Sequence, residues 1–319
     1  MRRKFLAGTD LEVSSFGLGT GEYGIKLNEN VAHRQMDIYT DVGGNLFDTA
    51  RVYGPEQSSE IIIGRWLKHH GNRDKLILST KGGHPPLENM SISRLSASDI
   101  QFDLNASLKN LATDYIDIYF LHRDDPTIPV FEILSVLENE VKKGNIRYYG
   151  CSNWTLSRVR EAEQCAKREG FMGFVCNQIK WSLADTNMFA MPDETLLSMD
   201  SDFLRYHENT KLSVMAYAST ASGYFIKRVT GMPLSAEQHA LYDNETNEII
   251  LKRLIDISEE SGISVGVLSL LYFYRQSFPA IPLCSFSREE QMRDALDLLT
   301  QNYPTDIMVE FDELKRFVY

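Results

Sequence analysis

A chain of 319 residues, of which 43% are hydrophobic, can bury a large core and does not have the composition of a disordered protein. Its net charge of −11 and isoelectric point near 5.2 argue against a nucleic-acid-binding surface, which would need clustered basic residues. No secretory apolar core follows the basic start at Arg2–Lys4, and the most apolar later stretch, Val265–Tyr274, is about half as long as a membrane-spanning helix. We therefore expect a cytoplasmic protein that binds neither nucleic acid nor membrane.

Short strand-like runs alternate with amphipathic helical segments along the whole chain. The expected strands are Ser15–Gly19, Asn45–Thr49, Leu76–Thr80, Ile116–Leu121, Arg147–Cys151, Phe174–Ile179, Leu212–Tyr217 and Ala280–Cys284. Several are nearly continuous apolar runs, as expected for parallel strands that are covered on both faces. The expected helices are Glu29–Asp41, Ser59–Lys68, Ser98–Leu111, Pro129–Lys142, Thr155–Arg168, Glu245–Glu260, Val265–Arg275 and Arg288–Leu299. Eight βα repeats without a linker predict one (β/α)8 TIM barrel over residues 1–319, an α/β fold, rather than two domains.

Two further features of the pattern bear on the barrel. Residues 4–13 form an expected β-hairpin that turns around Gly8-Thr9-Asp10. Two connections, Gly82–Ala97 and Ala218–Asn244, are long, and long connections in compact domains are often functional. Both follow strands, so they fall on the face where barrels place their active sites.

Polar residues follow almost every predicted strand. Residues just past the carboxyl ends of barrel strands converge on one mouth. The residues expected there are Gly19, Thr20, Asp48, Tyr53, Lys81, His122, Ser152, Asn153, Gln178, Tyr217 and Ser285. The sequence therefore predicts a polar site at the C-terminal mouth of the barrel.

Four of these residues have the chemistry that a carbonyl reductase needs. A phenol has a pKa near 10, and a neighbouring cation favours its ionised form, so Lys81 beside Tyr53 would help the phenol to release a proton. Asp48 could hold the Lys81 ammonium, and His122 could donate to a substrate carbonyl. Each residue alone has an ordinary structural interpretation, such as a packed tyrosine, a solvated lysine, a turn cap or a core histidine. Only the combination points to catalysis.

The order and spacing of four blocks resemble the aldo/keto reductase family over nearly the whole chain. The blocks are Asp48-Thr49-Ala50-x-x-Tyr53-Gly54, Ser79-Thr80-Lys81, Asp114-Tyr115-x-Asp117 leading to His122, and Gly150-Cys151-Ser152-Asn153. The resemblance implies an NAD(P)H-dependent oxidoreductase in which Tyr53 is the general acid and Asp48, Lys81 and His122 complete the catalytic set. It also implies that the N-terminal hairpin closes the bottom of the barrel.

The resemblance also implies a cofactor site. Ser152, Asn153 and Gln178 would bind the nicotinamide carboxamide, Tyr217 would stack on its ring, and Gly19 and Thr20 would lie beside the cofactor. The block around strand eight departs from the family pattern, because Ala295 stands where many members have an Asn near the adenine. The residues offered there for a 2′-phosphate are Ser285, Ser287, Arg288 and Gln291, with Glu289 and Glu290 opposing. We therefore favour NADP(H), with NAD(H) left open. No Gly-x-Gly-x-x-Gly element suited to a Rossmann-type site follows a strand.

The substrate is the least determined part of the prediction. Tyr23, His84, Trp154 and Trp181 are candidate mouth residues, and polar groups interleaved with flat rings favour a small polar or sugar-like aldehyde or ketone. The short segment after the last helix, residues 301–319, favours an open pocket. Neither the reaction direction nor the oligomeric state can be read from the chain.

Three alternatives remain beside the reductase. A non-catalytic or weakly catalytic cofactor-binding regulatory subunit of the same fold would lack turnover and would bind a membrane partner. A barrel hydrolase would need paired carboxylates, for which only Asp124-Asp125 is available. A metal site at His122-Arg123-Asp124-Asp125 is disfavoured by the adjacent arginine, and the four cysteines have no metal-ligand spacing, so we expect reduced thiols and no metal.

Overall fold

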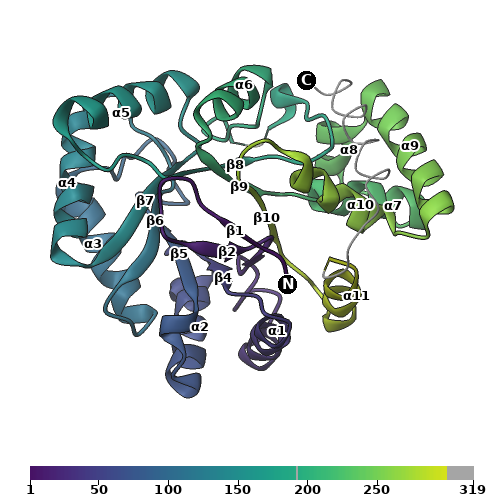
Figure 1. The fold of residues 1–319 in the computed structure, drawn as a ribbon, viewed down its shortest axis with the longest axis horizontal. Coiled ribbons are helices and arrows are strands. Elements are labelled where there is room, and N and C mark those ends of the chain that lie inside the picture. Colours follow the sequence, from purple (N-terminus) through teal and green to yellow (C-terminus); the bar gives the residue numbers. More distant parts are fainter. Residues whose placement is uncertain (192, 300–319) are drawn as a thin grey trace.

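The structure is a computed structural model that describes residues 1–191 and 193–299, so the prediction about residues 301–319 lies outside the described residues. Eight parallel strands close into a barrel in the order β10-β3-β4-β5-β6-β7-β8-β9 (Figure 1). The strands are β3 (Gly17–Gly19), β4 (Leu46–Asp48), β5 (Ile77–Gly82), β6 (Ile116–Leu121), β7 (Ile146–Ser152), β8 (Cys176–Lys180), β9 (Ser213–Tyr217) and β10 (Ala280–Cys284). The predicted (β/α)8 fold is confirmed.

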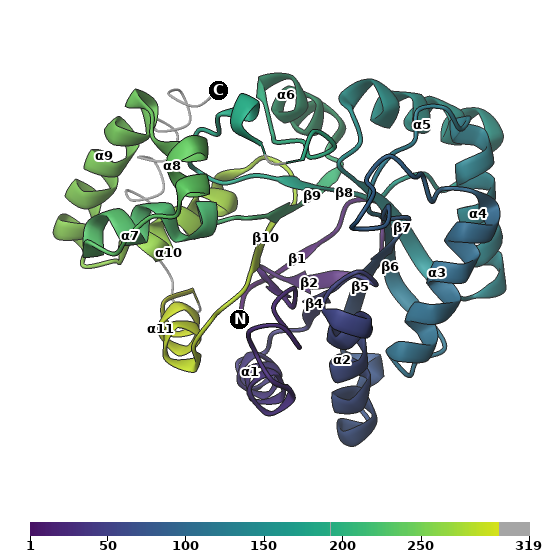
Figure 2. The same ribbon diagram turned by 180° about the vertical axis from the view of Figure 1, so that it is seen from behind.

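Helices surround the strands and cover the outside of the barrel (Figures 1 and 2). They are α1 (Glu29–Asp41), α2 (Ser58–His70), α3 (Ala97–Asn110), α4 (Val130–Lys143), α5 (Leu156–Glu169), α6 (Ser201–Thr210), α7 (Tyr224–Thr230), α8 (Ala236–Tyr242), α9 (Glu245–Ser261), α10 (Val265–Leu271) and α11 (Glu289–Leu299). Capping residues in the local sequence set the ends of many of these helices. The Thr155 side chain accepts from the Arg158 backbone N–H at the start of α5, and Gly170 ends that helix with a φ of 69°. Among the described helices, none combines the length and apolar character needed to cross a bilayer.

The N-terminal hairpin closes the end of the barrel that is opposite the predicted mouth. Strands β1 (Arg3–Phe5) and β2 (Glu12–Ser14) pair antiparallel, as predicted, and cross the centre of the view in Figure 1. Side chains from the hairpin pack against the barrel interior in a cluster that contains Leu6, Leu11, Val13, Leu46, Ile118, Phe120, Met215 and Ile281. The hairpin thereby fills that end of the barrel with apolar side chains.

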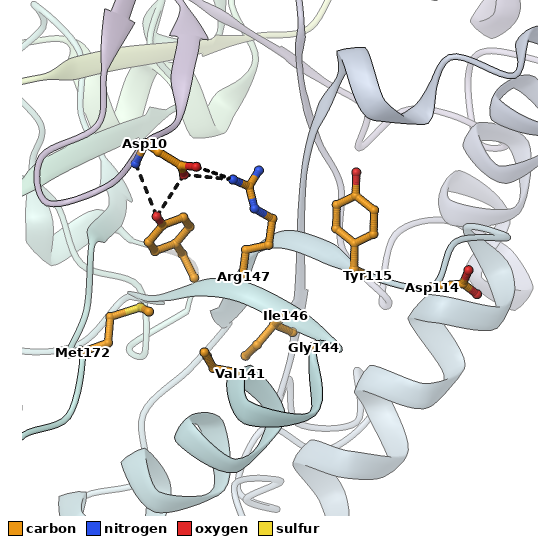
Figure 3. A pocket seen from close by; sticks show the side chains of 9 residues that line it. Asp10, Asp114, Tyr115, Val141, Gly144, Ile146, Arg147 and Met172 are labelled. Atoms are coloured by element: carbon orange, nitrogen blue, oxygen red, sulfur yellow. Dashed lines mark hydrogen bonds and ion pairs between the residues drawn. The ribbon is translucent and has the colours of Figure 1, made fainter.

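An ion pair fastens the hairpin turn to the barrel wall. Arg147 on β7 donates to both carboxylate oxygens of Asp10, at 2.8 and 2.9 Å, and the Tyr148 hydroxyl donates to the same carboxylate at 2.9 Å (Figure 3). A second nitrogen of Arg147 lies 2.9 Å from the buried carboxylate of Asp117. Asp10, Arg147 and Tyr148 line the open hollow in Figure 3, which lies at the hairpin end, away from the predicted site.

Candidate active site

Asp48 and Lys81 form a buried ion pair at the carboxyl ends of adjacent strands β4 and β5. The Lys81 Nζ lies 2.7 Å from Asp48 Oδ2 and also donates to the Thr49 carbonyl at 2.7 Å. The other carboxylate oxygen, Oδ1, accepts from Ser79 Oγ at 2.7 Å and from Gln178 Nε2 at 2.9 Å. Burial lowers the pKa of Lys81, but attraction to Asp48 and to Tyr53 outweighs it, so this pKa lies above its ordinary value. Lys81 is therefore a cation at neutral pH.

Tyr53 lies between the Lys81 cation and His122. Its backbone N–H donates to the Ala50 carbonyl at 3.0 Å, in the turn that follows β4. The Lys81 Nζ lies 4.9 Å from the centre of the Tyr53 ring, and the ring centres of Tyr53 and His122 are 5.9 Å apart. Tyr53 is half-buried, so it remains open to a ligand in the mouth. The fixed cation can stabilise negative charge on the phenol oxygen as the proton leaves.

His122 is held at the end of β6 as a neutral side chain. Its backbone N–H donates to the Gly82 carbonyl at 2.8 Å. Burial, followed by the positive charges of Lys81 and Arg123, holds the pKa of His122 well below its ordinary value. Its Nδ1 is buried and has no hydrogen-bond partner in the described part of the chain. Because a buried N–H without an acceptor is costly, we assign the proton to Nε2, and this tautomer can donate to a substrate oxygen.

The amides predicted to bind the cofactor lie beside the catalytic group. The backbone N–H of Asn153 lies 3.3 Å from the Gln178 carbonyl, which joins the ends of β7 and β8. Asn153 Nδ2 donates to Ser152 Oγ at 3.0 Å, and Asn153 Oδ1 accepts from the Tyr217 hydroxyl at 2.7 Å. Burial raises the pKa of Tyr217, so its hydroxyl keeps the proton that it donates. Gly150 precedes this block, and a Cβ there would lie 2.4 Å from the Cys176 carbonyl, so only glycine fits against β8.

The residues predicted around a 2′-phosphate lie together at the end of β10. Ser285, Ser287, Arg288 and Gln291 are all exposed. Arg288 has no ion pair with any side chain that the structure describes. Glu289, which the sequence placed as an opposing charge, pairs with Arg34 at 3.1 Å and with Arg293 at 2.8 Å. This compensation leaves Arg288 available to an anion.

Gly19 and Thr20 lie at the end of β3, beside this group, but only one of them is open. The Ser285 hydroxyl donates to the Gly19 carbonyl at 2.9 Å, and a Cβ on Gly19 would lie 2.8 Å from that hydroxyl. Thr20 is fully buried, and its hydroxyl bonds the Asp48 carbonyl and Ser59 Oγ, each at 2.9 Å. These bonds hold the turn after β4, and the cofactor contact of Thr20 stays a prediction.

Comparison with known proteins agrees with this geometry. The model of the family described as "Aldo/keto reductase family" matches residues 15–316. The chain belongs to the aldo/keto reductase family. It is an NAD(P)H-dependent oxidoreductase, as predicted.

The relatives of this reductase span nearly its whole length. It is 28% identical to the "Uncharacterized oxidoreductase YrpG" of Bacillus subtilis (strain 168), over 97% of this chain and 94% of that protein. It is 26% identical to "Protein tas" of Escherichia coli (strain K12), over 95% and 94% of the two chains. It is 24% identical to the "Aryl-alcohol dehydrogenase [NADP(+)]" of Phanerodontia chrysosporium, over 93% and 81%. The crystal structure of the thermostable aldo-keto reductase Tm1743 shares the fold, with a TM-score of 0.70 and 24% identity over 98% of this chain and all of that one.

Three of the four aromatic residues predicted to line the mouth of the reductase lie in its core instead. Tyr23, Trp154 and Trp181 expose at most 1% of their surface. The Trp154 ring packs edge-on against Phe174 at 5.0 Å, and its Nε1 donates to the Arg123 carbonyl. Trp181 packs among the rings of Tyr272, Phe273 and Phe278. Large flat rings gain more from burial between barrel and helices than from the mouth, so these predictions are corrected.

His84 is the fourth predicted substrate residue, and it lies at the site. Its ring centre is 4.7 Å from that of His122, with the ring planes 70° apart. The side chain is half-buried in the connection between β5 and α3. This connection was one of the two long segments that the sequence singled out.

A third long connection, which the sequence analysis missed, is tied to the site by Arg123. The segment between β8 and α6 contains Asp193 and Thr195, and the buried Arg123 guanidinium donates to Thr195 Oγ1 at 2.8 Å and to Asp193 Oδ2 at 3.2 Å. The backbone N–H of Leu197 donates to Asn153 Oδ1 at 3.2 Å. The sequence could have indicated this connection, because the interval between the sixth and seventh predicted strands is longer than a single short helix requires.

The carboxylates beside this segment serve structure. Asp124 is bonded to Arg158 at 2.9 Å, so it does not face His122 as a metal ligand or a hydrolytic partner would. Over residues 1–191 and 193–299, no cluster of three or more His, Cys, Asp or Glu side chains is arranged to hold a metal ion.

Proposed function

We propose that this reductase transfers hydride from NADPH to a small polar or sugar-like aldehyde or ketone, with Tyr53 as the general acid. The observation that carries the proposal is the group of four side chains at the mouth: a buried Asp48–Lys81 pair, Tyr53 beside the cation, and a neutral His122 opposite. The reverse reaction, oxidation of an alcohol, uses the same residues with the proton moving the other way.

Each protein group has a separate task in this scheme. When bound, the nicotinamide supplies the hydride that attacks the carbonyl carbon. His122 Nε2 donates to the carbonyl oxygen and orients it toward the Tyr53 hydroxyl, which gives up its proton as negative charge develops. The Lys81 cation stabilises the phenolate, and Asp48 holds Lys81 in place. Proton transfer by a positioned group contributes roughly 100- to 10,000-fold in rate.

The residues at the end of β10 support NADP over NAD. Arg288 is exposed without an ion pair among the described side chains, and it directly precedes the first turn of α11, where backbone N–H groups favour an anion. Arg34 and Arg293 neutralise Glu289 beside it. A relative bearing the name aryl-alcohol dehydrogenase [NADP(+)] agrees with this preference.

The cofactor proposal is tested by fluorescence titration of the purified protein with NADPH and NADH in parallel. We expect NADPH to bind at least about 10-fold more tightly, since a charged hydrogen bond contributes roughly 1.5–3 kcal/mol. The Arg288→Ala variant should lose roughly 10- to 100-fold in NADPH affinity and leave NADH affinity unchanged. Equal binding of both cofactors by the wild-type protein would contradict the preference, and binding of neither would contradict the proposed function.

The substrate proposal is tested with a carbonyl panel driven by the preferred cofactor. The panel contains small hydroxylated aldehydes, aldoses, unsubstituted aldehydes, bulky apolar ketones and an aryl aldehyde. We expect the highest kcat/KM with small polar aldehydes, because polar groups and His84 surround the mouth. A clear preference for bulky apolar ketones or for the aryl aldehyde would refute the substrate class but not the reaction.

A further inference from the structure

His84 is a second histidine at the mouth that the catalytic scheme does not use. It lies in the connection after β5, and its ring stands nearly perpendicular to that of His122, with 4.7 Å between the ring centres. The side chain is half-buried, so the ring is partly accessible from the solvent.

A hydrogen bond to the backbone fixes the tautomer of His84. His84 Nδ1 lies 2.6 Å from the Pro85 carbonyl oxygen, which can only accept, so Nδ1 carries the proton. Burial lowers the pKa of His84, and the positive charge of Arg123 acts in the same direction; these effects outweigh the bond to Pro85 and the carboxylates of Asp193 and Asp103. In the neutral ring Nε2 therefore has only a lone pair, and no described residue bonds it.

The backbone around His84 is held by buried groups. The Gly83 N–H donates to Asp103 Oδ2 at 2.9 Å, and the Gly82 carbonyl accepts from the His122 N–H at 2.8 Å. The Asp103 carboxylate, almost fully buried on α3, is itself paired with Arg94 at 2.5 Å and with Arg51 at 3.3 Å. Such support preorganises the ring, as an effective binding group requires.

The two histidines thus present opposite hydrogen-bonding groups, a donor on His122 and an acceptor on His84. A carbonyl compound with a hydroxyl on the adjacent carbon presents the complementary pair. Its carbonyl oxygen can accept a hydrogen bond, and the hydroxyl on the neighbouring carbon can donate one. We propose that His84 Nε2 accepts a hydrogen bond from this hydroxyl and so selects 2-hydroxy carbonyl substrates, an inference that rests on the proposed function. A carbonyl without the hydroxyl leaves Nε2 unpaired beside the substrate, and this lowers its transition-state affinity.

The test compares lactaldehyde with propanal, which differ only by the 2-hydroxyl group, as substrates for wild type, H84F and H84N. We expect wild type to prefer lactaldehyde by roughly 10-fold in kcat/KM, in line with one partly buried hydrogen bond. H84F should abolish this preference, so that the ratio of the two kcat/KM values falls toward one, whereas H84N, which keeps an acceptor, should restore part of it. The control is H69F, which changes the exposed His69 on α2 and should retain the preference.

The outcomes separate this inference from the proposed function. Equal wild-type kcat/KM for the two aldehydes would overturn the role of His84, while turnover of both would leave the reductase proposal intact. An equal fall for both aldehydes in H84F, with NADPH affinity unchanged, would also overturn it and indicate a merely structural ring. No turnover of either aldehyde by wild type, together with no cofactor binding, would overturn the proposed function and this inference with it. The wild-type comparison needs no variant, so it decides the matter even if H84F does not fold.

Discussion

The Lys81 ammonium lies 2.7 Å from the Asp48 carboxylate, and neither side chain exposes more than 4% of its surface. A buried charge pair of this kind costs desolvation energy on both sides, and it is stable only while both partners are present. The pair therefore bears on the stability of the fold as well as on the proposed catalysis. It also places a cation beside Tyr53, the proposed general acid.

We predict that Asp48→Asn will lower the free energy of unfolding by about 3–5 kcal/mol, because it leaves the Lys81 charge buried without compensation. Asp48→Asn/Lys81→Met should recover part of this stability and remain inactive, since the cation beside Tyr53 is gone. Urea denaturation at pH 7 measures both effects. Glu248→Gln, which breaks an exposed pair with Arg228, is the control and should cost less than about 1 kcal/mol. A double variant no more stable than Asp48→Asn would argue against an uncompensated charge as the cause.

Tyr53→Phe removes the proposed acid and almost nothing else, because the ring remains. We expect kcat to fall by roughly 100- to 10,000-fold, as for loss of a positioned proton donor. The NADPH dissociation constant, measured by fluorescence titration, should stay near the wild-type value. Wild-type turnover in the pure variant would show that another group protonates the substrate.

His207 gives the fold a dependence on pH that does not involve the active site. On α6 its Nδ1 lies 2.9 Å from the Leu212 carbonyl and its Nε2 lies 3.2 Å from Asn177 Nδ2. Burial lowers the pKa of His207 from 6.5 to about 4. Between these two pKa values the imidazole is protonated in the unfolded chain and neutral in the folded chain. The contribution of His207 to stability is therefore fully present above pH 6.5 and is lost as the pH falls toward 4.

We predict that this single group removes about 2–3 kcal/mol of wild-type stability between pH 7 and pH 4.5. A His207→Gln variant is expected to be less stable than wild type at pH 7 and to lose about 2–3 kcal/mol less on acidification. Urea denaturation at the two pH values measures the free energy of unfolding of each protein. The contributions of the other titrating groups are common to both proteins and cancel in the difference. Parallel pH profiles would show that His207 is not the responsible group.

Arg123 anchors the segment between β8 and α6. The same segment contacts Asn153, which we propose binds the cofactor. Arg123→Lys keeps the charge but loses the fork of donors that holds Thr195 and Asp193. We expect roughly 10-fold weaker NADPH binding, because Leu197 would no longer hold Asn153 Oδ1 reliably. Arg205→Lys, at an exposed pair on α6, serves as the control in the same titration. Unchanged affinity in Arg123→Lys would mean that the segment is held by other contacts.

Local patterns located the barrel strands because buried parallel strands are short, apolar and bounded by polar turns. Ile116–Leu121 and Ala280–Cys284 are strands with the predicted bounds. β5 continues to Gly82, two residues beyond its predicted end at Thr80, because Lys81 and Gly82 pair with Phe120 and Leu121 of the neighbouring strand. The short helix α6 was missed, since its ten residues carry too few periodic apolar positions to stand out.

Side-chain direction explains the errors at the mouth. Trp154 directly follows Asn153, which has a φ of 58°, and its indole packs beside Phe174. Nothing in the order of residues distinguishes such a ring from one that faces a substrate. The burial of Thr20 was equally hidden from the sequence, because its partners Ser59 and Asp48 come from other segments.

The sequence by itself determined the barrel, the hairpin and the four residue types at the ends of β4, β5 and β6, because strand periodicity and residue order are local properties of the chain. Tertiary structure alone decided the charge states of Lys81 and His122. Lys81 stays charged because Asp48, 33 residues away, is buried against it, and His122 stays neutral because burial and two cations surround it. His84 Nε2 keeps a lone pair because Nδ1 carries the proton and donates it in a hydrogen bond to the Pro85 carbonyl. Charge states depend on distances through space and on the exclusion of water, and folding sets both.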